Sequence, residues 1–163
     1  MNRLAVLIVV DESEVRDALA RDLEPLAETL RIETPDDAVD ARAALDDIFA
    51  HGDRLALVLA DHRLPGATGV DFLVELSAID DTRATRKVLV TGQADQADTI
   101  RAVNQADLDH YIAKPWDPAT LISVTVDTVT DYIIDERIDP LPYVRDLDGP
   151  RLLEAYAERA SDR

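Results

Sequence analysis

The sequence predicts an α/β domain in which a parallel sheet of five strands carries helices on both faces. Two short apolar runs, Leu4–Val10, which is rich in Val and Ile, and Leu55–Ala60, are typical of strands buried on both faces. Segments with helical spacing of apolar residues alternate with these runs, which is the order of strand–helix–strand units. A chain of 163 residues that is 47% hydrophobic can form the core of one such domain.

The elements follow one another in a regular order. Continuous apolar runs indicate strands, apolar residues at intervals of three and four indicate helices, and Pro and Gly mark boundaries. We expect strands over residues 4–10, 30–33, 55–60, 87–90 and 110–113. We expect helices over residues 14–24, 35–51, 70–78, 95–106 and 121–134, with loop chemistry at 64–69.

Individual residues set several of these boundaries. Ser13 is placed to cap the helix over 14–24, and Pro25 ends or kinks it. Pro35 suits the first turn of the next helix. The segment 121–134 is rich in β-branched residues, which propensity alone would allow as a strand. Its length and its broken alternation favour a helix.

The last part of the chain reads as an appendage. Three prolines at positions 140, 142 and 150 indicate a linker, and residues 151–160 have the spacing of a short amphipathic helix. We therefore divide the chain into a domain over 1–136 and a linker plus helix over 137–163. The appendage either folds back onto the domain or extends a dimer contact, or the chain is a fragment of a longer protein. We favour a stand-alone domain with a helical appendage.

Composition excludes several functional classes. Seventeen basic and 34 acidic residues give a net charge of −17, which disfavours direct binding to nucleic acid or to an anionic membrane. The absence of cysteine excludes disulfides and thiol chemistry. The longest apolar run, Leu4–Val10, is far shorter than the ~20 residues of a membrane helix, and it leads directly into acids rather than a cleavage site. We expect a cytoplasmic protein.

Four of the expected strands end in polar residues that chemistry can use. Asp11, Asp61, Thr91 and Lys114 each follow a strand, and the carboxyl ends of parallel strands are where open α/β sheets bind ligands. Carboxylates hold Mg²⁺, whereas an ammonium and a hydroxyl hold phosphoryl oxygens. A carboxylate can also accept a phosphoryl group as a nucleophile. The set predicts a cation site beside a phosphate site.

Three segments resemble the receiver domains of two-component response regulators. They read VLADHRLPGATGVDFL over 58–73, KVLVTG over 87–92 and YIAKPW over 111–116. The resemblance spans about residues 4–134, and the Lys-Pro-Trp-Asp sequence is similar to that of a subset found on multidomain regulators. It implies a flavodoxin-like, doubly wound, five-stranded parallel sheet of order 2-1-3-4-5 with a C-terminal helical extension.

The resemblance also implies a chemistry. A sensor histidine kinase or phosphotransfer protein would pass its phosphoryl group to Asp61. Mg²⁺ would lie between Asp11, Asp61 and the backbone carbonyl of Arg63. Lys114 and Thr91 would bind the phosphoryl oxygens. Output would pass through contact with a downstream protein target or through a homodimer, and the protein would not be a turnover enzyme.

Two further features of the family are expected here. Tyr111 would turn inward as Thr91 moves toward the phosphoryl group, and the Lys114–Pro115 peptide would be cis.

His62 would either tune the lifetime of the phosphoryl group, together with Arg63, or point to solvent. A hydrolase of the haloacid-dehalogenase type is disfavoured, because that class needs an acid where Arg63 stands.

One position departs from the family pattern. Receivers usually carry two adjacent acids after the first strand, and alignment puts Asp11 on the second and Val10 on the first. We expect weakened Mg²⁺ binding for that reason; Glu12 would substitute only through a shifted backbone. The alternative function is an atypical receiver-like binding or dimerisation module with little or no phosphorylation.

Overall fold

The computed structural model of the protein describes residues 2–64, 67–92 and 104–161. Within these residues, the main sheet has five strands: β1 (Leu4–Val9), β2 (Arg31–Glu33), β3 (Arg54–Asp61), β6 (Arg86–Thr91) and β7 (His110–Ala113). Every neighbouring pair is parallel, and the order is β2-β1-β3-β6-β7. Counted along the chain, this order is 2-1-3-4-5, which confirms the predicted sheet.

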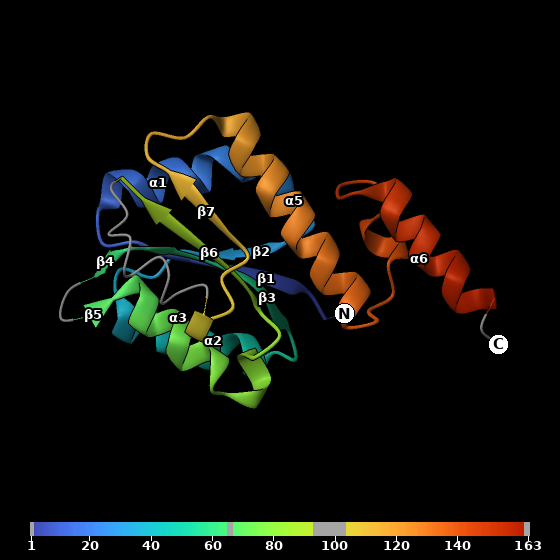
Figure 1. The fold of residues 1–163 in the computed structure, drawn as a ribbon, viewed down its shortest axis with the longest axis horizontal. Helices are drawn as coiled ribbons and strands as arrows, with labels where there is room; N and C mark the ends of the chain where they lie inside the picture. The colour runs from blue at the N-terminus through green and yellow to red at the C-terminus, as the bar shows by residue number, and fades with distance from the viewer. Residues whose placement is uncertain (1, 65–66, 93–103, 162–163) are drawn as a thin grey trace.

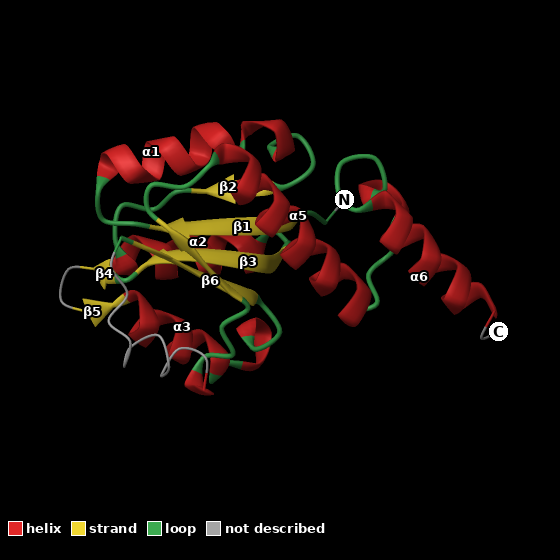
Figure 2. Cartoon of the chain, turned by 45° about the horizontal axis from the view of Figure 1, so that its top comes forward, coloured by secondary structure: helices red, strands yellow, loops and turns green. Residues whose placement is uncertain are grey.

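Helices cover both faces of this sheet (Figure 1). The described α-helices are α1 (Ser13–Asp22), α2 (Ala38–Ala50), α3 (Gly69–Ser77), α5 (Pro118–Asp135) and α6 (Gly149–Ser161). The other described elements are short 3-10 turns, η1 (Glu24–Leu26), η2 (Asp80–Thr82) and η3 (Leu141–Tyr143), and a small antiparallel pair, β4 (Arg63–Leu64) with β5 (Ala67–Thr68). Figure 2 shows the sheet between its helices, with α6 set apart from them.

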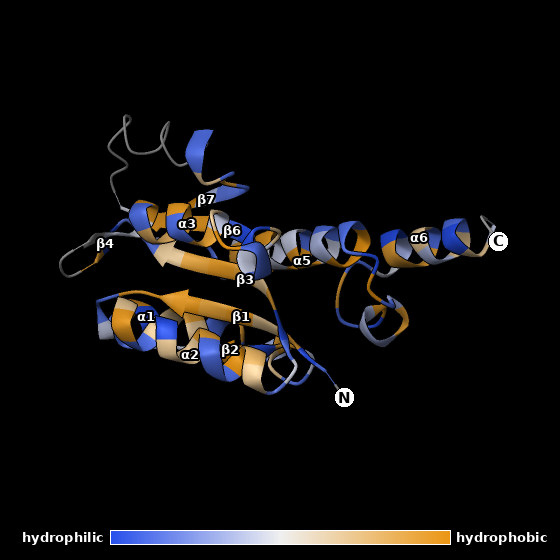
Figure 3. Ribbon diagram, turned by 90° about the horizontal axis from the view of Figure 1, so that it is seen from below, coloured by the Kyte–Doolittle hydropathy of each residue, from blue (hydrophilic) through white to orange (hydrophobic). Residues whose placement is uncertain are grey.

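The first strand shows why a continuous apolar run forms the centre of the sheet. Its side chains alternate between two hydrophobic clusters, so both faces of the strand are buried. Leu4, Val6 and Ile8 join the cluster under α1 and α5, whereas Leu7 and Val9 join the cluster under α2 and α3. In Figure 3 the central strands β1 and β3 are accordingly hydrophobic along most of their length, while the helices carry both hydrophobic and polar residues.

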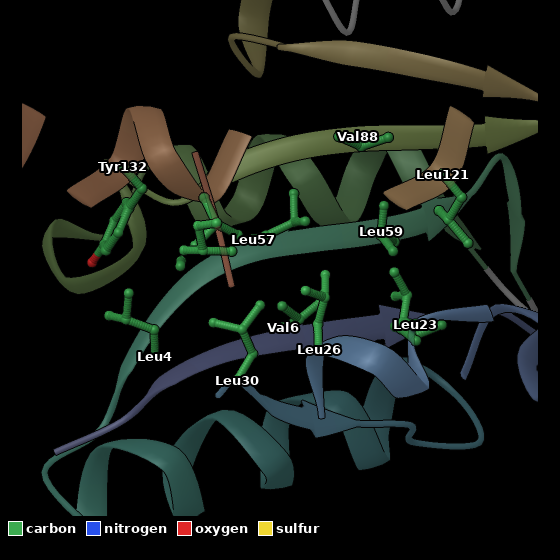
Figure 4. Packing of buried hydrophobic residues seen from close by; sticks show 14 of the residues in the cluster. Leu4, Val6, Leu23, Leu26, Leu30, Leu57, Leu59, Val88, Leu121 and Tyr132 are labelled. Carbon is green, nitrogen blue, oxygen red and sulfur yellow. The ribbon is translucent and has the colours of Figure 1, made fainter. Parts of the chain in front are cut away.

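The cluster under α1 and α5 is the larger of the two, and it extends to Leu152 of α6. Figure 4 shows Leu4 and Val6 of β1 and Leu57 and Leu59 of β3 in this cluster, with Tyr132 of α5 beside them. The β-branched segment predicted as a helix over 121–134 is α5, so the preference for a helix is confirmed. Tertiary packing on the sheet outweighs its strand propensity.

Several predicted details were wrong. The residue before α1 is Glu12, and Ser13 is the first residue of the helix rather than its cap. Helix α2 begins at Ala38 with the Asp37 side chain as its cap, so Pro35 lies outside it. The predicted loop at 64–69 contains the β4–β5 pair. The predicted helix over 95–106 falls mostly outside the described residues.

The C-terminal appendage folds back onto α5. Tyr143, Leu147 and Leu152 are buried and belong to the same cluster as the sheet residues. Arg159 donates hydrogen bonds to the backbone oxygens of Ile138 at 2.7 Å and of Ile134 at 3.3 Å, close to the point where α5 ends. The appendage therefore contacts the end of α5 that is distant from the β4–β5 pair (Figure 1). None of the described helices is both long and apolar enough to cross a membrane.

A close backbone approach fixes the start of α3 beneath the end of β3. A Cβ atom at Gly69 would lie 1.8 Å from the backbone oxygen of Asp61, a distance that no side chain tolerates. The Gly69 N–H also donates to the His62 backbone oxygen at 2.9 Å. Only glycine permits this contact, which ties α3 to the residue at the end of β3.

We predict that Leu152→Ala destabilises the whole domain, because Leu152 is fully buried in the cluster that includes the sheet. The expected loss is about 2–5 kcal/mol in the free energy of unfolding. Leu153→Ala is the matched control: Leu153 is 48% exposed on the same helix, and its substitution should change stability by less than about 0.5 kcal/mol. Urea unfolding measures the free energy of unfolding of both variants. Equal losses in the two variants would show that the appendage is not part of the cooperative fold.

We predict that Gly69→Ala lowers the free energy of unfolding by about 1–3 kcal/mol, because the backbone beside Asp61 must shift. An alanine at an ordinary helical position would instead stabilise by about 0.5–1 kcal/mol. Gly92→Ala is the control, since its Cβ would meet no atom nearer than the Lys114 Cβ at 4.0 Å. A Gly69→Ala variant as stable as the wild type would contradict the close approach.

Candidate functional site

A pocket of about 420 Å³ opens where the sheet strands end at their carboxyl side. Its lining residues come from the loops and strand ends of β1, β3, β6 and β7, and they are Glu12, Asp61, His62, Arg63, Thr91, Gly92 and Lys114. The structure thus brings together Asp61, Thr91 and Lys114, as the sequence predicts. These residues are far apart in the chain, and the parallel register of the strands brings their ends to one edge.

Asp61 is the last residue of β3, and its side chain is only 7% exposed. Its Oδ2 accepts a hydrogen bond from the Lys114 Nζ at 2.6 Å. Its Oδ1 has only a long contact, at 3.5 Å, from the Arg63 backbone N–H. A buried carboxylate is costly unless it is paired, and the Lys114 ammonium meets that requirement. The Oδ1 atom is left the less engaged of the two oxygens.

Thr91 ends β6 with a buried hydroxyl that has no hydrogen-bond partner in the part of the chain that the structure describes. Its side chain lines the pocket and the residue is 3% exposed. Among the described residues, its Oγ1 makes no hydrogen bond. Burying a hydroxyl without a partner costs about 1–3 kcal/mol. A phosphoryl oxygen in the pocket is a partner that this hydroxyl lacks.

Lys114 is held by the loop that follows β7. Its backbone N–H donates to the backbone carbonyl oxygen of Thr91 at 2.9 Å. Its peptide bond to Pro115 is cis, as the resemblance implies. Two residues on, the Trp116 Nε1 donates to the Asp22 Oδ2 at 2.9 Å. The loop is therefore attached to β6 on one side and to α1 on the other, which limits where the Lys114 ammonium can lie.

Lys87 is the other lysine of the chain, and it plays no part in the pocket. It lies near the start of β6, fully buried, and its Nζ donates to the Thr85 backbone oxygen at 2.7 Å. Burial lowers the pKa of its ammonium, and the carboxylate of Asp109 opposes that shift. Lys114 is thus the lysine whose ammonium faces Asp61.

Of the two acids that follow β1, one is among the residues that line the pocket. Asp11, the expected metal ligand, is exposed and is not among the residues that line the pocket, whereas Glu12 is. Val10 is fully buried in the hydrophobic cluster and contributes no acid. No spacing rule singles out Glu12, since both acids follow the strand directly.

The acids present fit a divalent cation of the magnesium type. Within the described ranges, no group of three or more His, Asp or Glu side chains is arranged to hold a metal. Mg²⁺, however, needs only one or two carboxylates because it keeps several waters. Asp61 and Glu12, both lining the pocket, satisfy that requirement.

Three further candidates are placed as follows. Arg63 is exposed at the pocket, and its side chain forms no ion pair with another described residue that would draw it away. His62 is partly buried, and its backbone N–H donates to the Val90 oxygen at 3.3 Å. Tyr111 is 60% exposed on β7 and is not turned inward.

Comparison with known proteins agrees with this geometry. The family described as "Response regulator receiver domain" matches residues 6–125. The hydrogenase transcriptional regulatory protein HoxA of Cupriavidus necator is 38% identical over 117 residues, which cover 72% of this chain and 22% of that protein. This chain therefore spans about a fifth of the length of that relative.

Solved structures show the same fold. The signal receiver domain of an HD domain-containing protein from Pseudomonas fluorescens Pf-5 has a TM-score of 0.68 at 24% identity, covering 80% of this chain and 98% of that one. The receiver domain of the sensor histidine kinase PA1611 from Pseudomonas aeruginosa has a TM-score of 0.63 at 24% identity, covering 79% and 98%. The family model matches residues 6–125, and the sheet order and the strand-end pocket agree with that match. The chain therefore belongs to the response regulator receiver domain family.

Proposed function

We propose that this protein is a phosphoacceptor response regulator of two-component signal transduction, phosphorylated on Asp61. The observation that carries the proposal is one pocket in which a buried carboxylate, paired with Lys114 at 2.6 Å, lies beside the unpartnered hydroxyl of Thr91. A nucleophile, a cation and a hydroxyl donor are the groups that phosphoryl transfer to a carboxylate requires.

The donor in this proposal is a phosphohistidine of a sensor histidine kinase or phosphotransfer protein. An Asp61 oxygen attacks phosphorus, a P–O bond forms, and the donor's P–N bond breaks with its electron pair leaving on the imidazole. Lys114 neutralises charge on the transferring phosphoryl oxygens, and the Thr91 hydroxyl donates to one of them. The residues act by position and charge, as is general for phosphoryl transfer.

Magnesium belongs to the proposal as the cation of the pocket. The PA1611 receiver structure is described with a magnesium ion coordinated in its active-site cleft. Here Asp61, the backbone carbonyl of Arg63 and an acid after β1, either Asp11 or Glu12, are the groups that would hold it. When bound, Mg²⁺ supplies positive charge against the phosphoryl oxygens.

Output is proposed to pass through a downstream protein target or a homodimer. The strong negative charge disfavours direct contact with nucleic acid. HoxA, however, is named a transcriptional regulatory protein. The comparison with HoxA therefore does not support the expectation that this chain has no direct contact with nucleic acid. Three expectations stay predictions: the division of the chain into 1–136 and 137–163, the cytoplasmic location, and the absence of turnover on a separate substrate.

We predict that incubation with a small-molecule phosphodonor and Mg²⁺ adds the mass of one phosphoryl group to the wild-type chain and none to Asp61→Asn. The reason is that the amide cannot form the acyl phosphate. Mass spectrometry of the intact protein measures it. Asp46→Asn, which alters an exposed acid on α2, is the control and should be phosphorylated like the wild type. An unmodified wild type would favour the alternative of a receiver-like module without phosphorylation.

We predict that Thr91→Val leaves the free energy of unfolding unchanged or raises it by about 1 kcal/mol, because the lost hydroxyl has no partner. The same variant should lose the spectral changes that phosphorylation causes. Thr85→Val is the matched control: Thr85 is equally buried, but its Oγ1 donates to the Leu55 oxygen at 2.8 Å. Loss of this hydrogen bond should lower the free energy of unfolding by about 1–3 kcal/mol.

Urea unfolding compares the stability of these two variants, and amide NMR spectra with and without phosphodonor compare their response. The account of Thr91 fails if Thr91→Val is destabilised as much as Thr85→Val, since the hydroxyl would then have a partner in the unphosphorylated protein.

A further inference from the structure

We infer that Glu12, and not its neighbour Asp11, supplies the carboxylate that binds a divalent cation together with Asp61. The inference rests on the proposed phosphoacceptor function and names a ligand that the alignment of acids does not assign. The juxtaposition behind it is direct: Glu12 and Asp61 line one pocket, and Asp11 is not part of that lining.

Position 10 contributes no carboxylate to the pocket, because it is a valine. Val10 is fully buried among the apolar side chains under α1 and α5. Its carbonyl oxygen accepts a hydrogen bond from the Arg16 Nη1 at 3.2 Å, which ties this part of the backbone to α1. The acid that most receivers carry at this position is absent, so any carboxylate from this loop must come from Asp11 or Glu12.

The conformation of Glu12 leaves its carboxylate available. Glu12 occupies the position before α1, in extended geometry with φ −78° and ψ 117°. Side chains at this position usually accept a hydrogen bond from the first turn of the helix. Glu12 makes no such bond, and no described residue forms an ion pair with it. Glu12 therefore lines the pocket, and its side chain is not engaged by the first turn of α1.

A second observation points to a ligand in this pocket. The Thr91 hydroxyl is 97% buried, lines the same pocket and has no hydrogen-bond partner among the described residues. A buried polar group without a partner in the protein is the feature expected where a bound group supplies one. A bound group in the pocket would supply the hydrogen-bond partner that the described residues do not provide.

The charges of the lining favour a divalent cation as part of that bound group. The residues that line the pocket include two acids, Glu12 and Asp61, and two bases, Arg63 and Lys114, so their formal charges cancel. A phosphoryl group adds about 1.5–2 negative charges. A divalent cation next to Glu12 offsets that addition, whereas without Glu12 the pocket would have less charge to attract the cation.

The test is isothermal titration of MgCl₂ into the full chain at constant ionic strength. The variants are Glu12→Gln and Asp11→Asn, each of which removes one charge and keeps the side-chain shape. Even groups that reach a metal indirectly change its affinity by about 10- to 100-fold. Glu12→Gln should therefore weaken Mg²⁺ binding by about tenfold or more, and Asp11→Asn should weaken it much less. Glu14→Gln, an exposed acid in the first turn of α1, controls for long-range charge.

The outcomes separate this inference from the proposed function. Glu12→Gln with wild-type affinity, or an equal or larger loss in Asp11→Asn, overturns the assignment of Glu12. If Asp61→Asn still abolishes Mg²⁺ binding in that case, the phosphoacceptor pocket stands. A wild type that binds no Mg²⁺ at millimolar concentrations overturns both. Thermal unfolding of each variant confirms that the comparison is made on folded protein.

Discussion

The pairing of the Lys114 ammonium with the buried Asp61 carboxylate is the interaction on which the site depends. At 2.6 Å it offsets the cost of burying a charge at the end of a central strand. It also joins the last residue of β3 to the residue that follows β7, two strands that are separated in the sheet by β6. The loop that carries Lys114 is in turn attached to β6 by a backbone hydrogen bond and to α1 through Trp116 and Asp22.

The molecule keeps its chemistry and its C-terminal appendage at opposite ends. The pocket lies where the strands end, while η3 and α6 contact the far end of α5 (Figure 1). Buried residues of the appendage share a cluster with the sheet, so their contribution is to stability. The pocket differs: the Thr91 hydroxyl has no hydrogen-bond partner among the described residues, and we propose that a bound group accepts its hydrogen bond.

Much of the fold could be predicted because strands buried on both faces have continuous apolar sequences, as Leu4–Val9 and Arg54–Asp61 show. The residue that follows such a strand lies at the functional edge of the sheet, so Asp61, Thr91 and Lys114 could be named from their positions. Which of two adjacent acids enters the pocket could not be predicted, because the backbone angles between β1 and α1 decide it. The contact of Gly69 with the Asp61 backbone was equally inaccessible, since it joins two elements in space.

A crystal structure of the full chain with Mg²⁺ and beryllofluoride, a stable mimic of the phosphoryl group, tests the central claim most directly. The account predicts beryllium bonded to an Asp61 oxygen, with the Lys114 Nζ and the Thr91 Oγ1 in contact with fluorine atoms and the cation between Asp61 and Glu12. Beryllofluoride bound at another carboxylate, or a Lys114 ammonium that points away from an occupied Asp61, would contradict it.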